Sequence, residues 1–179
     1  WDYTLIQRGL LDIINAAKHL DEKSKLTFLI SMPIFAEKAS IDKFHALLDH
    51  HKVRKHFTLT SEIRNLPLVL PAIDAYVYPI NMDEPSWAPV SALEALSQGT
   101  PVITTRIKII EAFLKEDDAL FYEPGHPKEL AKTVQFLLEN KNEVKKRTAE
   151  AKKRVNKRFG REAVVKIVRD QLQHFNKEV

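Results

Sequence analysis

The chain contains no cysteine, and only 4 of its 179 residues are glycine, against a usual ~7%. Without cysteine the fold has no disulfide, no thiolate nucleophile and no cysteine-ligated zinc. The few glycines leave no GxGxxG, GxxxxGK or GxSxG signature, which excludes three common enzyme motifs. No hydrophobic run reaches the ~18 residues of a membrane-spanning helix. Because a cysteine-free chain suits a reducing compartment, we expect a cytoplasmic protein.

Hydrophobic residues make up 44% of the chain and charged residues 29%, a balance typical of a globular domain. A domain of this length buries roughly 70% of the surface that its unfolded chain exposes, so it can hold a hydrophobic core without disulfides or structural metal ions. No linker or repeat divides the sequence, and we expect one domain over residues 1–179. Since the chain opens with Trp1, we expect it to be a piece of a longer protein.

The net charge of +4 is unevenly distributed. Residues 141–179 hold 13 Lys and Arg against 5 Asp and Glu, while residues 1–140 hold 15 against 19. The basic residues alternate with apolar ones at helical spacing, which indicates either a solvated helix face or a patch for anionic lipid headgroups at the inner face of a membrane. No aromatic residues are interleaved as a stacking platform, so we expect no nucleic-acid binding. The residues concerned are Lys145, Lys146, Arg147, Lys152, Lys153, Arg154, Lys157 and Arg158.

Helical and strand patterns alternate along the first two thirds of the chain. Short, almost continuously apolar strands between helices are typical of a parallel sheet covered on both faces, and the last third reads as helix alone. The sequence therefore predicts an α/β fold with a Rossmann-like three-layer α/β/α parallel sheet and a helical C-terminal tail. We expect strands in 26–30, 56–60, 75–78, 102–104 and 119–122, and helices in 10–20, 41–48, 66–73, 90–97, 107–116, 127–140, 142–159 and 161–175.

The loop over residues 79–89 leads into the predicted helix 90–97. In an open parallel sheet, ligands bind where loops leave the carboxyl ends of the strands and enter helices. Pro89 suits a first helical turn, and the N–H groups of Val90, Ser91 and Ala92 would then point unpaired into the loop. With the helix dipole behind them, these groups predict an anion site that fits a phosphate.

Glu94 lies one turn further into the same helix. A carboxylate this close to a bound phosphate repels it unless a neutral group with hydroxyl donors lies between the two. A vicinal diol such as ribose meets this condition, because both hydroxyls can donate to one carboxylate. The alternative is a surface carboxylate with no ligand.

The segment Leu93–Thr104, LEALSQGTPVIT, resembles the EA(M/L)xxGxPVI block of retaining GT-B glycosyltransferases of family 4. The similarity continues elsewhere: Arg8–Gly9 resembles the (K/R)G segment of that family, residues 74–79 its aDv.v.Ps segment, and residues 122–138 its pgdp..La segment. Essentially all of residues 5–175 can be aligned with its C-terminal, nucleotide-sugar-binding domain.

The resemblance implies a role for individual residues. Glu94 matches the glutamate that binds the ribose hydroxyls of the donor nucleotide. Arg8 matches the basic residue that neutralises the diphosphate, together with the helix start at Val90 and Ser91, whereas on its own Arg8 reads as a solvated arginine before a helix. The loop that packs on the base corresponds to Thr60, Ser61 and Ile63.

The sugar end of the implied site departs from the family pattern. Ser86 stands where the first glutamate of E-x7-E is expected, and Glu84 takes that place only if the loop holds two extra residues. Pro89 replaces a glycine whose N–H faces the donor. Trp87 either stacks on the sugar or anchors the loop. We therefore assign the donor sugar to Glu84, Ser86 and Trp87 as a group.

The implied function is that of the donor domain of a retaining glycosyltransferase, a hexosyltransferase. It would bind a nucleoside-diphosphate sugar for transfer to a glycan or a lipid-linked acceptor. The acceptor site would lie in an N-terminal domain of the same protein, which this chain lacks. No catalytic side chain is assigned within the chain, and we expect the chain alone to be inactive.

Two alternatives remain open: a domain similar to a nucleotide-sugar epimerase, and a non-catalytic α/β interaction module with a basic helical face. For the glycosyltransferase reading we expect no cofactor and no metal. Four histidines cluster in sequence, but no closed set of metal ligands accompanies them. These are His45, His50, His51 and His56.

Overall fold

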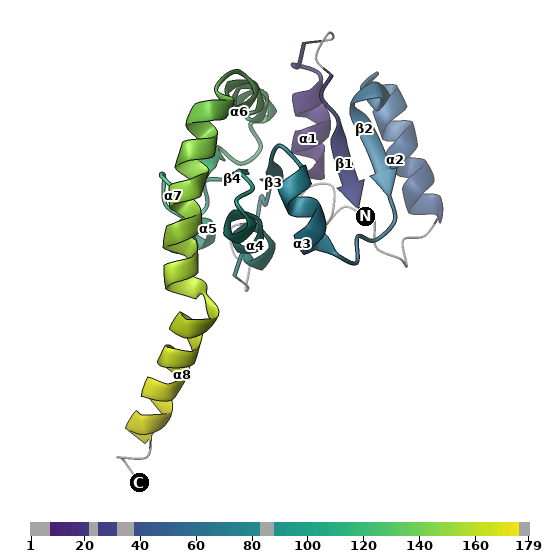
Figure 1. Cartoon of the computed structure of the whole chain (residues 1–179). Helices are drawn as coiled ribbons and strands as arrows, with labels where there is room; N and C mark the ends of the chain where they lie inside the picture. The colour runs from purple at the N-terminus through teal and green to yellow at the C-terminus, as the bar shows by residue number, and fades with distance from the viewer. Residues whose placement is uncertain (1–7, 22–24, 32–37, 83–87, 176–179) are drawn as a thin grey trace.

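The computed structural model describes residues 8–21, 25–31, 38–82 and 88–175. Helices and strands alternate over the first two thirds of the chain, as the sequence predicts, and the last third is helical (Figure 1). The α-helices are α1 (Leu10–Ala17), α2 (Lys38–His50), α3 (Leu66–Val69), α4 (Val90–Gln98), α5 (Lys108–Phe113), α6 (Pro127–Glu139), α7 (Lys141–Phe159) and α8 (Arg161–Phe175). The 3-10 helices are η2 (Arg54–His56) and η3 (Leu70–Ala72).

The described strands form two parallel sheets, and this confirms the predicted α/β class. In the first, β1 (Phe28–Ser31) pairs with β2 (Phe57–Thr60). The second has the order β3 (Tyr76–Tyr78), β4 (Val102–Thr105) and β5 (Leu120–Tyr122). All three pairings are parallel, so the carboxyl ends of paired strands lie on one edge.

Two hydrophobic cores lie on opposite sides of β4. Val102 belongs to one and its neighbour Ile103 to the other, because successive side chains of a strand point to opposite faces. The Ile103 core contains α1, α2 and α6, with Ile14 and Phe44 fully buried. The Val102 core contains α4, α5 and α7, with Leu96 fully buried. Helices therefore cover both faces of the second sheet, which gives the predicted three layers.

The helix predicted over 66–73 is divided. It forms α3 and then the tighter η3, and each of the two pieces has a proline near its start. Pro71 has no N–H to donate to a carbonyl four residues back, and its ring crowds that carbonyl, so a regular α-helix cannot continue through it.

The basic helix α7 is less solvated than its sequence suggests. It packs across α4, and all three of its arginines bind the connection at residues 113–119. Arg147 donates to the carbonyl of Ala119 at 2.7 Å and Arg158 to that of Phe113 at 3.0 Å. The three arginines therefore fasten α7 to the α/β body. Exposed lysines on the other side remain, namely Lys145, Lys146, Lys153 and Lys157.

The last helix, α8, extends away from the α/β body (Figure 1). Its large apolar side chains are exposed, from 45% for Val165 to 62% for Leu172. No helix in the described part of the chain is long and apolar enough to cross a membrane. The exposed apolar residues of α8 are Val164, Val165, Ile167, Val168 and Leu172.

Candidate functional site

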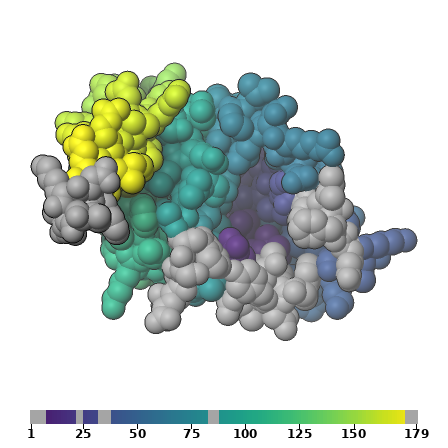
Figure 2. All heavy atoms as spheres, turned by 90° about the horizontal axis from the view of Figure 1, so that it is seen from below, coloured from purple at the N-terminus to yellow at the C-terminus, as the bar shows by residue number. Residues whose placement is uncertain are grey.

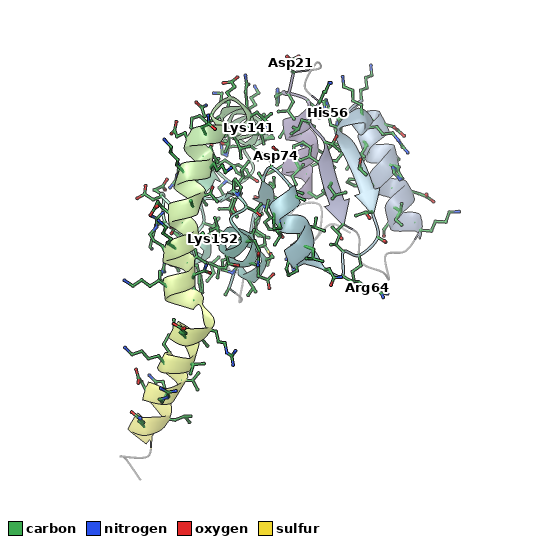
Figure 3. The ribbon with its side chains drawn as sticks, viewed as in Figure 1. Asp21, His56, Arg64, Asp74, Lys141 and Lys152 are labelled. Carbon is green, nitrogen blue, oxygen red and sulfur yellow. The ribbon has the colours of Figure 1, made fainter. Side chains whose placement is uncertain are left out.

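The candidate site lies at the edge of the sheets where the parallel strands end. Figure 2 looks onto the molecule from the side toward which β1 and β2 point in Figure 1, and purple atoms from the start of the described chain lie in a hollow there. Arg64, in the connection after β2, lies at the same edge, whereas His56 and Asp74 lie away from it (Figure 3). Ligands of open α/β sheets bind at this edge.

The start of α1 packs directly on the end of β3. Gly9 is the N-cap residue of α1 and has φ +67°, a conformation that suits glycine. A Cβ at this position would overlap the carbonyl oxygen of Pro79, the residue that follows β3. Arg8, partly buried and next to Gly9, is therefore held beside the first residues of the loop after β3.

The first residues after β3 are fixed by β4. The buried hydroxyl of Thr104 donates to the carbonyl of Tyr78 at 2.9 Å, and that of Thr105 donates to the carbonyl of Ile80. Buried hydroxyls paired with backbone acceptors fix the position of the chain, because breaking either bond leaves a buried polar group unpaired.

Asp12 joins three segments at this edge. Only 6% of the residue is exposed, and its Oδ2 accepts hydrogen bonds from Asn81 Nδ2 at 3.0 Å, Gly125 N at 3.1 Å and Tyr122 Oη at 3.4 Å. Burial, with Asp12 as neighbour, raises the pKa of the Tyr122 phenol, so Tyr122 stays protonated and donates. The carboxylate thus ties α1 to the loop after β3 and to the loop before α6.

The start of α4 differs from the expectation in one detail. Pro89 is the N-cap residue and not the first helical residue, and the N–H of Val90 donates to the carbonyl of Ala88 at 2.8 Å. The expectation that Val90 offers a free N–H was therefore wrong, because Pro89, with φ −76° and ψ 60°, forms an inverse γ-turn that pairs this N–H with the carbonyl of Ala88. The first bond within the helix runs from Leu93 N to Pro89 O. Ser91 and Ala92 thus have no acceptor within the helix.

Glu94 lies one turn into α4 and is exposed. Gly99 ends the helix in a left-handed conformation, with φ +88°. A solvent-facing carboxylate near the start of a helix can accept hydrogen bonds from a ligand without loss of core packing.

The three residues assigned to the base follow or end β2. Thr60 and Ile63 are partly buried, and Ser61 is exposed. Ser31, at the end of β1, accepts a hydrogen bond from Ile63 N and donates one to the carbonyl of Ser61, both at 3.3 Å. The connection after β2 is therefore held against the end of the neighbouring strand.

The residues assigned to the sugar, Glu84, Ser86 and Trp87, lie outside the described residues. Arg106, which follows β4, is already paired. Its guanidinium contacts the carboxylates of Glu111, Glu116 and Glu123 and keeps the pKa of Glu116 below its usual value.

Within the described ranges, no group of three or more His, Asp or Glu side chains could hold a metal ion. His56 is buried, with its ring Nδ1 at 3.2 Å from the carbonyl of Leu26. This histidine therefore has a structural partner.

Sequence reasoning missed Asp12, Asn81 and Ser31. The structure shows Asp12 buried on α1, one helical turn before the buried Ala16. The partners of these residues come from distant segments, which periodicity along one helix or strand does not reveal.

Several solved structures share this fold, and they include proteins named as glycosyltransferases. HepE from Anabaena in complex with UDP-glucose has a TM-score of 0.79 at 16% identity, and the match covers 97% of this chain and 46% of that chain. A glycosyltransferase from Rickettsia africae has a TM-score of 0.80 at 16% identity, and the match covers 96% of this chain and 44% of that chain. The catalytic domain of the Helicobacter pylori cholesterol-α-glucosyltransferase has a TM-score of 0.67 at 19% identity. This match covers 83% of this chain and 89% of that chain.

This chain thus spans less than half the length of HepE, and identities this low support the fold alone. No curated protein sequence matches the chain. A family model described as glycosyl transferases group 1 matches residues 5–154. The chain therefore belongs to the glycosyl transferases group 1 family.

Proposed function

We propose that this chain is the donor-binding domain of a retaining glycosyltransferase and binds a nucleoside-diphosphate sugar. The observation that carries the proposal is that two helix starts share one sheet edge: α1, preceded by Arg8, and α4, with Glu94 one turn in. UDP-glucose in the complex of the similar HepE supports a nucleotide-sugar ligand.

In this proposal the diphosphate lies between Arg8 and the start of α4. An arginine fork can bind phosphate oxygens in pairs, and the N–H groups of Ser91 and Ala92 add donors at the positive end of the helix dipole. The side chain of Glu94 binds the ribose diol. Thr60, Ser61 and Ile63 face the base, and Glu84, Ser86 and Trp87 face the sugar.

Transfer would proceed with retention at the anomeric carbon, to a glycan or lipid-linked acceptor bound by another domain of the same protein. The contribution of this chain would be electrostatic, because Arg8 and α4 stabilise the negative charge that develops on the leaving diphosphate. A guanidinium in this position takes the part of a divalent cation, so we propose that the reaction needs no metal. The exposed lysines of α7 would suit a peripheral contact with an anionic membrane surface.

Calorimetric titration with UDP tests the diphosphate site. Replacing one charge-assisted partner costs about 1.5–3 kcal/mol, so Arg8→Ala should weaken UDP binding about 10- to 150-fold. The matched control is Arg161→Ala, at the exposed start of α8, which should bind as the parent does. A parent chain that stays folded but binds none of UDP, GDP or ADP at millimolar concentration would contradict the proposal.

The ribose role of Glu94 has its own test. The parent should bind 2′,3′-dideoxy-UDP about tenfold more weakly than UDP, because the diol is missing, whereas Glu94→Gln should discriminate much less between the two. Glu143→Gln changes an exposed carboxylate on α7 and serves as the control. Equal discrimination by the parent and Glu94→Gln would remove Glu94 from the site.

A further inference from the structure

The amide of Asn81 is half satisfied. Its Nδ2 donates to Asp12 Oδ2 at 3.0 Å, while its buried Oδ1 has no hydrogen-bond partner among the described residues. Buried polar atoms in native proteins are nearly always paired, and an unpaired acceptor costs free energy, so such an atom calls for an explanation.

Asp12 fixes which way this amide points. An ionised carboxylate only accepts hydrogen bonds, so the NH2 group of Asn81 must face Asp12, and Oδ1 must face away from it. Asp12 is itself immobilised, because Gly125 N and Tyr122 Oη donate to the same oxygen. The orientation of the acceptor is therefore built into the fold.

The chemistry of an acceptor limits what it can bind. A diphosphate carries acceptor oxygens and no proton to donate at neutral pH, so Oδ1 of Asn81 would repel it. A hydroxyl group can donate. Asn81 follows β3 at the edge shared with the starts of α1 and α4, where a nucleotide sugar would present its hydroxyl groups.

We propose that Asn81 Oδ1 accepts a hydrogen bond from a hydroxyl of the donor sugar, and that Asp12 is the positioning residue that aims it. This rests on the proposed function, since it needs a nucleotide sugar at the same edge. Because Glu94 is proposed to bind the ribose hydroxyls, Asn81 would contact the sugar and not the nucleotide.

The test compares calorimetric affinities for UDP and for UDP-glucose, UDP-galactose and UDP-N-acetylglucosamine. In Asn81→Ala, the UDP-sugar that the parent binds most tightly should bind about five- to tenfold more weakly, the scale of one hydrogen bond, while UDP changes less than twofold. Asn142→Ala, an exposed asparagine on α7, should bind both ligands as the parent does.

Asp12→Asn provides the second arm. An amide at this position can donate as well as accept, so Asn81 is free to turn, and the same selective loss of UDP-sugar affinity is expected. Val155→Ala, at a buried position on α7, controls for destabilisation: it should lower the thermal midpoint and keep the ratio of UDP-sugar to UDP affinity.

Unchanged UDP-sugar affinity in Asn81→Ala would overturn the proposal. So would equal loss of UDP and UDP-sugar affinity, since that marks a purely structural role. A parent chain that binds no nucleotide at all is a different result: it refutes the proposed function, and the role of Asn81 falls with it.

Discussion

Gly9 is the residue on which the geometry of the site depends most. It must adopt a left-handed conformation, and it must also leave room for the carbonyl of Pro79. Few residues meet both conditions. A residue with a side chain is strained in the left-handed conformation, and its Cβ would collide with the carbonyl of Pro79. The (K/R)G pair of the family has a physical reason here: glycine lets the preceding arginine lie against the end of β3.

Two glycine substitutions separate these conditions. Gly9→Ala should destabilise the chain by about 3 kcal/mol or more, because a backbone collision adds to the left-handed strain. Gly125 has φ +72°, but a Cβ added there would meet no atom of the described residues within 4 Å, so Gly125→Ala should cost only about 1 kcal/mol. Urea unfolding measures both values, and equal costs would contradict the collision at Gly9.

At the scale of elements, α7 acts as a clamp on the connection between α5 and β5. Asp118 has a side chain only 1% exposed, and Arg154 Nε donates to its Oδ1 at 2.8 Å. The N–H of Lys115 donates to the other oxygen at 3.0 Å. A buried carboxylate with these partners holds the connection in place, because removing its cation leaves a charge in an apolar setting.

Neighbouring residues on α7 give a matched pair for this clamp. Arg154→Ala should lower the free energy of unfolding by about 2 kcal/mol, since Asp118 stays buried without its guanidinium. Lys153→Ala should change it by less than about 0.5 kcal/mol, because the pair of Lys153 with Glu150 lies in solvent. Thermal or urea unfolding of both variants decides the matter, and an Arg154→Ala chain as stable as the parent would exclude the clamp.

The elements themselves were largely predictable from the sequence. Apolar periodicity found each described α-helix in nearly the right place, and the segment 93–104 indicated the family. The contacts between elements were not predictable in this way. The stripe on α7 shows that Arg147, Arg154 and Arg158 leave the apolar face, but it does not show that the connection at residues 113–119 lies opposite them. Asp12 escaped notice for the same reason, since its partners lie on other elements.

At the scale of the molecule, α8 is the part that the rest of the fold does not cover. Among the described helices it packs mainly against α7, the helix before it, and its apolar side chains lie on an open surface. Its charged residues nearly balance, with Arg161, Lys166 and Arg169 against Glu162 and Asp170. Such a surface favours association in solution over a purely electrostatic contact.

The chain by itself should therefore self-associate through α8. Analytical ultracentrifugation at increasing concentration should show a reversible rise in mean mass, and the double change Val168→Lys with Leu172→Lys should suppress it. Both residues are more than half exposed, so the thermal midpoint should stay near that of the parent. A parent chain that remains monomeric at hundreds of micromolar would contradict this expectation.

The three hydrogen bonds to Asp12 Oδ2 bridge 69, 110 and 113 positions of sequence. Closing loops of this length is entropically costly, and such contacts form late relative to local ones. During synthesis, the carboxylate of Asp12 is made 113 residues before its last partner, Gly125. The edge that would bind the donor is thus completed only after α1, both sheets and the turn before α6 have come together.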